Sequence, residues 1–168
     1  MMPDLDTATA QHTVLATRLG QLTLVRRGDR LTGLYFPHHW HMPDRASFGP
    51  REDAGFAEAG RQLTGYLAGT RTSFELPLEP DGTEFQLRVW ELVSQIPYGQ
   101  TTTYGDLARR LGGGATPQEV GAAVGRNPLC VLIPCHRVLG STGKLTGYAG
   151  GLHRKRLLLD LERAQAWA

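Results

Sequence analysis

Near its start the chain has a stretch that is rich in apolar, β-branched and aromatic residues. Residues 12–27 (HTVLATRLGQLTLVRR) and 30–36 (RLTGLYF) have the composition of strands. Gly28-Asp29 between them is a turn dipeptide, so we expect a β-hairpin over 12–36. Residues 37–50 contain proline and histidine without any periodicity, which predicts a loop.

The next stretch, residues 52–68, has the spacing of an amphipathic helix. Its apolar positions fall seven and four apart, as on one helix face: Phe56, Leu63 and Leu67. Residues 73–80 (SFELPLEP) alternate like a short strand that ends in proline. Pro80-Asp81-Gly82 indicates a turn and a domain boundary. We therefore expect a small α/β domain over residues 1–82.

The second half of the chain has mainly helical spacing. Thr83 precedes EFQLRVWELVSQI, whose apolar residues form one stripe, and Pro97-Tyr98-Gly99 ends that helix. Thr103, followed three residues later by Asp106, resembles a capping box before YGDLARRL, and the glycines after it stop the helix. The members of the apolar stripe are Phe85, Val89, Leu92, Val93 and Ile96.

A stronger helix start follows at Thr116-Pro117-Gln118-Glu119, which combines an N-cap, a proline at the first helical position and a glutamate at the third. Two short helices joined by a glycine-rich turn suggest a helix-turn-helix, although such pairs are also common packing units. Residues 129–134 (LCVLIP) predict a short buried strand, 140–151 a glycine-rich loop, and 152–164 a final helix.

Composition narrows the class of protein. The 168 residues include 40% hydrophobic and 20% charged side chains, which is typical of a globular domain. Residues 1–82 and 83–168 carry net charges of −2 and +4, and an arginine-bearing second half is compatible with nucleic acid without establishing it. No apolar stretch is long enough to cross a membrane, and the first residues lack a secretory signal. We expect a cytoplasmic protein.

The most informative short string is Ile133-Pro134-Cys135-His136-Arg137. A thiolate is the nucleophilic form of cysteine, and a neighbouring imidazole or cation favours it. Adjacent residues of a strand point to opposite faces, so a turn or a bridging water is needed for Cys135 to use His136. Glu162 borders the apolar stripe of the last helix and is a candidate to orient the base. A buried structural cysteine, and a Glu162 paired with an arginine of its own helix, are the plain alternatives.

Other features of the sequence are weaker candidates for a functional site. The glycine-rich loop fails the phosphate-binding pattern because Gly143-Lys144 is followed by Leu145, so a loop that closes over a substrate fits better. The histidines of the 37–50 loop do not have the spacing of a zinc site, and we expect no metal: His38, His39 and His41. Cys130 and Cys135 lie too close in an apolar run to suggest a disulfide framework.

Taken together, the strings from Thr83 to Glu162 resemble the O6-alkylguanine-DNA alkyltransferase family, also called methylated-DNA–protein-cysteine methyltransferases. The resemblance rests on TEFQLRVWELVSQIPYGQTTTYGDLA, VGAAVGRNP, IPCHRV, TGYAGGL and LLDLE in the same order and spacing. It implies an α/β protein with a small N-terminal α/β domain. The C-terminal domain over 83–168 is then mostly helical, with a winged helix-turn-helix and an active-site cysteine.

The resemblance also implies a chemistry. Such proteins rotate a damaged nucleotide out of duplex DNA, and a cysteine thiolate then takes the alkyl group from guanine O6 in a single turnover. O4-alkylthymine is the second substrate that the resemblance leaves open. No cofactor is implied, since the protein itself is the acceptor. The implied partner is double-stranded DNA containing O6-alkylguanine, acted on by a monomer without contact to a membrane.

By position, the resemblance assigns roles to individual residues. Cys135 corresponds to the alkyl acceptor, His136 to the base that acts on it through water, and Glu162 to the carboxylate that polarises His136. Asn127 corresponds to the residue that braces the active-site segment, and Tyr104 to the tyrosine that assists proton delivery and flipping. Substrate-binding positions are the backbone of Val138 together with Tyr148 and Ala149 of the loop that walls the pocket.

One departure from the family pattern concerns DNA binding. Gln118 stands where the family has an arginine that fills the space left by the extruded base, and Glu119 replaces a small residue. A carboxylate repels phosphate, although Glu119 also completes the capping box with Thr116. We therefore expect weaker DNA binding or flipping than in relatives that carry the arginine. Arg126, seven residues after Glu119, is a candidate for phosphate contact.

Two other functions stay open at this point. A non-enzymatic reader of alkylated bases would account for Gln118 and Glu119, but it has no need for the thiol of Cys135. An unrelated cysteine hydrolase would use the thiol, but the sequence has no visible oxyanion signature.

Overall fold

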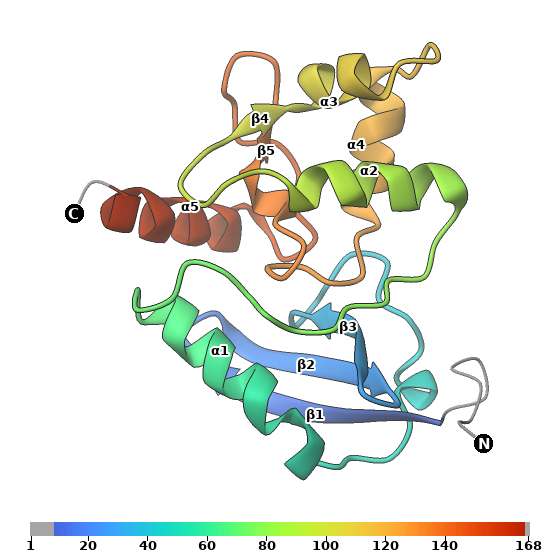
Figure 1. Cartoon of the computed structure of the whole chain (residues 1–168), viewed down its shortest axis with the longest axis vertical. Helices are drawn as coiled ribbons and strands as arrows, with labels where there is room; N and C mark the ends of the chain where they lie inside the picture. The colour runs from blue at the N-terminus through green and yellow to red at the C-terminus, as the bar shows by residue number, and fades with distance from the viewer. Residues whose placement is uncertain (1–8, 167–168) are drawn as a thin grey trace.

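The computed structural model describes residues 9–166, with the side chains of residues 9–164, and places a three-stranded sheet with one helix beside a helical half (Figure 1). The prediction that the chain lacks a secretory signal falls mostly on residues 1–8, which lie outside the described part. No helix in the part of the chain that the structure describes is long and apolar enough to cross a membrane.

The N-terminal sheet has three strands in the order β1-β2-β3, all antiparallel: β1 (Ala10–Thr17), β2 (Gly20–Arg27) and β3 (Arg30–Tyr35). The predicted turn at Gly28-Asp29 is present, but the prediction of a single hairpin over 12–36 was wrong. The run 12–27 folds back on itself, because Thr17 pairs with Gly20 across a two-residue turn. Gly20 has a φ of 104°, a conformation that glycine adopts without strain.

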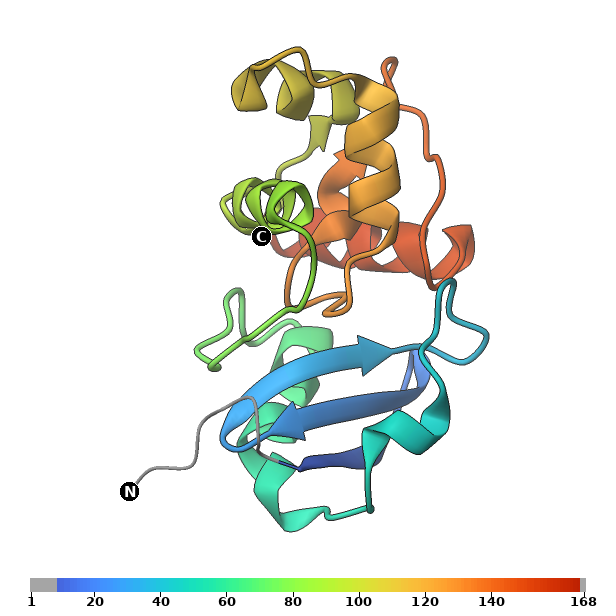
Figure 2. The ribbon, with the colours of Figure 1, turned by 90° about the vertical axis from the view of Figure 1, so that its right-hand side faces the viewer.

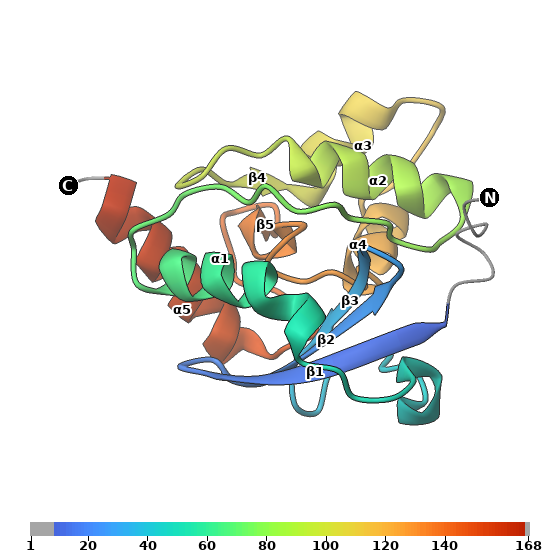
Figure 3. The ribbon, with the colours of Figure 1, turned by 60° about the horizontal axis from the view of Figure 1, so that its bottom comes forward.

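Helix α1 (Ala57–Leu67) covers one face of the sheet (Figure 2 and Figure 3) and confirms the helix predicted over 52–68. A short 3-10 turn, Ala54–Phe56, precedes it, and another, Arg45–Phe48, lies within the predicted loop 37–50. The sheet and the helix bury one continuous set of side chains against each other: Leu22, Leu24, Leu34, Phe56, Leu63, Tyr66 and Leu67.

The connection from α1 to the helical half differs from its prediction. Residues 73–80 do not form a strand; the segment makes a single bridge to β3, in which the Leu31 N–H donates to Pro77 O and the Glu79 N–H donates to Leu31 O. Prolines at 77 and 80 lack the N–H groups that a ladder requires. Residues 80–82 have no regular structure and form no turn.

The helical half contains α2 (Glu84–Ser94), α3 (Tyr104–Leu111), α4 (Pro117–Gly125) and α5 (Leu152–Ala166). Two-residue strands β4 (Thr102–Thr103) and β5 (Val138–Leu139) pair in parallel. The predicted caps are present, as the side chains of Thr83, Thr103 and Thr116 each accept from the backbone N–H three residues on.

Helices α3 and α4 pack together as the predicted helix-turn-helix, joined through the glycines at 112–114 (Figure 1). The capping boxes at Thr83 and Thr116 are complete. The box predicted at Thr103 is only half formed, because the Asp106 carboxylate pairs with Arg109. In the second of these, Glu119 bonds back to the Thr116 backbone N–H at 3.1 Å, so its carboxylate is held on its own helix. The predicted fold class, a small α/β domain with a mostly helical second domain, is confirmed.

Residues 129–134 are buried as predicted, but they form a tight turn instead of a strand. The Ile133 N–H donates to Leu129 O at 2.8 Å, which closes the chain on itself, and Val131 has a φ of 73°. A β-branched residue in this conformation is strained, so the surrounding contacts must impose it. The turn reverses the chain just before Cys135.

Candidate active site

The turn that leads to Cys135 is held from both halves of the molecule. Asn127, which is 2% exposed, donates from Nδ2 to Ile133 O at 2.9 Å and accepts the Leu129 N–H on Oδ1 at 2.9 Å. From the sheet, the Leu34 N–H donates to Pro128 O at 2.8 Å. The amide of Asn127 therefore spans the turn, which is the bracing position predicted for it.

Cys135 begins a 3-10 turn that ends at Arg137, and its side chain is buried next to a second thiol. Its Sγ lies 3.9 Å from Cys130 Sγ. The Cys130 thiol, together with Asn127 and the positive charge of Lys155, lowers the pKa of Cys135 below its ordinary value despite burial. The thiolate, which is the nucleophilic form, is thus favoured at this position. Cys135 and His136 therefore lie in a turn and not in a strand.

His136 and Glu162 form a fully buried pair. The distance from His136 Nε2 to Glu162 Oε2 is 2.7 Å, and both side chains are at most 1% exposed. Burial lowers the pKa of His136 below its ordinary value even though Glu162 opposes the shift, so the imidazole is neutral at pH 7. Since a carboxylate can only accept, Nε2 carries the proton. The other ring nitrogen, Nδ1, is buried and has no hydrogen-bond partner among the described residues.

Glu162 is held by three further groups, and none belongs to its own helix. Arg137 donates from Nε to Oε1 and from Nη2 to Oε2, both at 2.8 Å. The Tyr66 hydroxyl, from α1, donates to Oε2 at 2.5 Å, and the Gly99 N–H donates to Oε1 at 3.3 Å. Burial raises the pKa of Glu162, but the bonds from His136 and Arg137 outweigh it and hold the pKa well below its usual range.

Lys155 is a site residue that the sequence reasoning missed. It is fully buried, and its Nζ donates to Thr146 O at 2.7 Å in the glycine-rich loop. Burial lowers the pKa of Lys155 to about 8, while Cys135 acts to raise it. The sequence did contain a signal for Lys155. Lys155, Leu158 and Glu162 are spaced three and four residues apart, which places Lys155 on the same face of the last helix as Glu162. Tyr66 was missed as well, and its distance along the chain left no local signal.

The predicted substrate-binding residues lie around the same centre. Val138, in β5, is fully buried, and Tyr148 and Ala149 of the loop are buried as well. Tyr104, the first residue of α3, accepts a hydrogen bond from the Thr146 hydroxyl at 3.4 Å, and burial raises its pKa. The structure thus places Tyr104 against the loop that carries Tyr148.

The predicted DNA-binding residues lie at the two ends of α4. Thr116 and Gln118 are exposed at its N-terminus, where α3 and α4 meet. Arg126 is exposed just after its C-terminus, roughly 13 Å away along a nine-residue helix. Helix α4 ends at Gly125, so Arg126 is its C-cap and not a residue within the helix.

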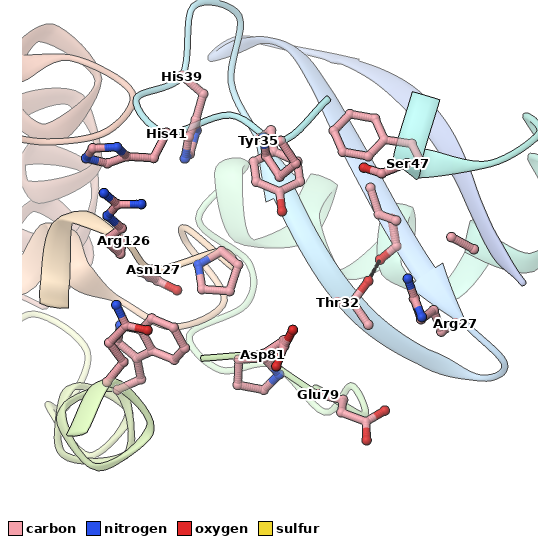
Figure 4. A pocket seen from close by; sticks show the side chains of 18 of the residues that line it. Arg27, Thr32, Tyr35, His39, His41, Ser47, Glu79, Asp81, Arg126 and Asn127 are labelled. Carbon is pink, nitrogen blue, oxygen red and sulfur yellow. Dashed lines mark hydrogen bonds between the residues drawn. The ribbon is translucent and has the colours of Figure 1, made fainter. Parts of the chain in front are cut away.

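A groove of about 610 Å³ separates the two halves near Arg126. Figure 4 shows the side chains that line it, with Arg126 and Asn127 from the helical half and Tyr35, His39 and His41 from the sheet half. The Nδ1 atom of His39 accepts the Phe36 N–H at 3.2 Å. Within residues 9–164, no group of three or more histidine, cysteine or acidic side chains has the geometry to hold a metal ion.

Comparison with known proteins identifies the family. One family model, the ribonuclease-like domain of 6-O-methylguanine DNA methyltransferase, matches residues 11–80, and a second, the DNA binding domain of the same proteins, matches residues 84–164. The methylated-DNA–protein-cysteine methyltransferase of Mycobacterium tuberculosis is 44% identical over 148 residues, which span 88% of this chain and 89% of the relative. That of Methanosarcina acetivorans is 52% identical over 107 residues, or 64% of this chain and 69% of the relative.

Among solved structures, the crystal structure of Mycobacterium tuberculosis OGT in complex with DNA has a TM-score of 0.86 and 41% identity. The match covers 92% of this chain and 94% of that one. Both halves of the chain, and the order in which they occur, are therefore accounted for by one family. The chain belongs to the methylated-DNA–protein-cysteine methyltransferase family.

Proposed function

We propose that this protein repairs DNA by transferring the alkyl group of O6-alkylguanine, and in second place of O4-alkylthymine, to Cys135 in a single turnover. The observation that carries the proposal is the buried thiol whose thiolate form is favoured, followed directly by a neutral, carboxylate-bound histidine. The relatives named above are methyltransferases of this type, and one of them binds DNA in its crystal structure.

In the proposed reaction, Nδ1 of His136 takes the proton of Cys135 through a water molecule. Nδ1 is suited to this step because it is unprotonated and has no other partner among the described residues. The imidazolium that forms is stabilised by Glu162, whose carboxylate stays ionised because Arg137 and Tyr66 donate to it.

The sulfur of Cys135 then attacks the alkyl carbon. The S–C bond forms as the C–O6 bond breaks, and the electron pair of that bond goes to guanine, which is protonated as it leaves. We assign the delivery of this proton to Tyr104, which lies at the loop and whose raised pKa keeps its hydroxyl protonated. The stable thioether ends the reaction, so no cofactor is required.

Substrate binding is proposed for the backbone of Val138 and for Tyr148 and Ala149. Only 3% of Cys135 is exposed, and we propose that the loop over residues 140–151 moves to admit a flipped base. We assign Thr116, Gln118 and Arg126 to the DNA contact, with Arg126 near the groove between the halves. We further propose a monomer that works in the cytoplasm, with domains at 1–82 and 83–168.

Intact-protein mass spectrometry tests the transfer. The purified protein is mixed with excess duplex that contains one O6-methylguanine, beside Cys135→Ala and Cys130→Ala. We expect one added methyl group in the wild type and in Cys130→Ala, and none in Cys135→Ala. An unchanged wild-type mass, with the duplex still bound, would contradict alkyl transfer and favour a non-enzymatic reader of alkylated bases.

A further inference from the structure

The chain contains two cysteines, and the fold places them in contact. Cys130 and Cys135 are five residues apart, yet their Sγ atoms are separated by only 3.9 Å. The strained turn at Val131 and the bond from the Ile133 N–H to Leu129 O bring the two side chains to the same point. A disulfide bond is about 2.05 Å long, so a shift of roughly 2 Å would join the sulfurs.

The two thiols have opposite chemical character. The thiolate is favoured at Cys135, whereas the neighbouring Cys135 sulfur and complete burial raise the pKa of Cys130 well above its ordinary value. Cys135 is also the one with residual exposure, 3% against 0% for Cys130. An oxidant that enters the site therefore meets a reactive Cys135 first, with a protonated thiol directly behind it.

A third group lies against the second thiol. The Nε2 atom of His39 is 4.0 Å from Cys130 Sγ. Because Nδ1 of His39 accepts the Phe36 N–H, the neutral ring carries its proton on Nε2, which thus faces the sulfur. This N–H can stabilise negative charge that develops on Cys130 as its S–H bond breaks.

We propose that Cys130 is a resolving thiol that captures oxidised Cys135 as an intramolecular Cys130–Cys135 disulfide, with hydrogen peroxide or an organic hydroperoxide as the oxidant. In the first step the Cys135 thiolate attacks one peroxide oxygen and the O–O bond breaks. Hydroxide leaves and is protonated to water, and Cys135 becomes a sulfenic acid.

In the second step the Cys130 sulfur attacks the sulfur of that sulfenic acid. The S–S bond forms, the S–O bond breaks, and the departing hydroxyl takes the Cys130 proton and leaves as water. Two thiols have then lost two electrons, and one hydrogen peroxide has become two waters. A dithiol reductant reverses the modification by thiol–disulfide exchange, whereas further oxidation of Cys135 to a sulfinic acid is irreversible.

The consequence for repair rests on the proposed function. A disulfide leaves no thiolate to accept an alkyl group, so the oxidised protein is inactive but recoverable. The disulfide itself does not depend on that function, because only the proximity and the character of the two thiols produce it.

The test compares wild type with Cys130→Ser after brief treatment with hydrogen peroxide, a denaturing quench with N-ethylmaleimide, and tryptic digestion. Cleavage after Arg126 and Arg137 places both cysteines in one peptide, residues 127–137. We expect the wild-type peptide to lose two hydrogens and take up no maleimide. In Cys130→Ser we expect about tenfold more Cys135 sulfinic acid. Equal sulfinic acid in the two proteins, with no internal disulfide in the wild type, would overturn the proposal.

Two controls complete the design. In Cys135→Ser the buried thiol at position 130 is expected to resist the same treatment, since the group that attacks peroxide is gone. Dithiothreitol is expected to restore methyl transfer in wild type about tenfold more completely than in Cys130→Ser. If wild type forms the disulfide but never accepts a methyl group, the repair function fails and the disulfide stands. The wild-type peptide mass decides the proposal even if a variant does not fold.

Discussion

The Arg137–Glu162 pair yields the sharpest stability prediction, through the substitution Arg137→Met. Methionine replaces the aliphatic part of the side chain but removes both 2.8 Å bonds to the carboxylate and the bond to Ile96 O. Breaking a buried ion pair from one side costs about 3–5 kcal/mol, because an uncompensated charge is left in the interior. That is a large part of the roughly 5–15 kcal/mol that holds a domain folded.

Urea unfolding at pH 7 measures this cost. With a slope of about 2 kcal/mol per molar urea, a loss of about 4 kcal/mol lowers the midpoint by about 2 M. In a Glu162→Gln background the guanidinium is itself the uncompensated charge, so removing it costs little. We therefore expect a coupling energy of about 2–3 kcal/mol from the double-mutant cycle.

Acid pH provides the internal check. The folded-state pKa of Glu162 lies below its ordinary value of 4.5, so its contribution to stability is fully present above about pH 4.5 and is lost as pH falls below it. Without Arg137 the folded-state pKa rises, and protonation relieves the buried charge. The difference between wild type and Arg137→Met should thus shrink on acidification. A difference below 1 kcal/mol at pH 7, or one that is constant from pH 7 to pH 4, would refute this reasoning.

Three further predictions concern rate and DNA binding. Lys155→Met removes the cation beside Cys135. The rate of single-turnover transfer should therefore fall about tenfold at pH 7 for each unit by which the pKa of the thiol rises, and it should recover at high pH. A variant that is equally slow at every pH would indicate that Lys155 acts by anchoring the loop instead. Gln118→Arg should speed repair and tighten binding to duplex DNA, and Gln118→Met is the control of similar length. Equal repair rates in wild type and Gln118→Arg would contradict the expectation that Gln118 weakens DNA binding or base flipping. Arg126→Ala should flatten the plot of log affinity against log salt by about 0.9 if this side chain neutralises a phosphate, and an unchanged slope would exclude that contact.

Local signals in the sequence account for the helices of the second half. The caps at Thr83 and Thr116 form as predicted because a cap depends only on residues three positions apart. The strand predictions at 73–80 and 129–134 failed for a related reason. Composition indicates that these segments are apolar, and an apolar segment can be a strand or simply a buried chain. Hydrogen bonds to distant residues decide whether such a segment pairs as a strand. Isolated bridges from Leu31 to Leu78 and from Leu34 to Leu129 link those segments to the first sheet.

In the candidate site, too, local motifs could be read from the sequence and contacts between distant residues could not. Cys135, His136 and Glu162 could be named from the sequence because the family motif contains them, and the structure brings them together. Tyr66 could not, because it meets Glu162 across 96 residues of sequence. A buried carboxylate needs donors wherever the fold can supply them, and Glu162 has donors from both halves of the chain. The N-terminal half therefore does more than cover the helices: through Tyr66 it helps keep Glu162 ionised, and through Leu34 it fixes the turn before Cys135.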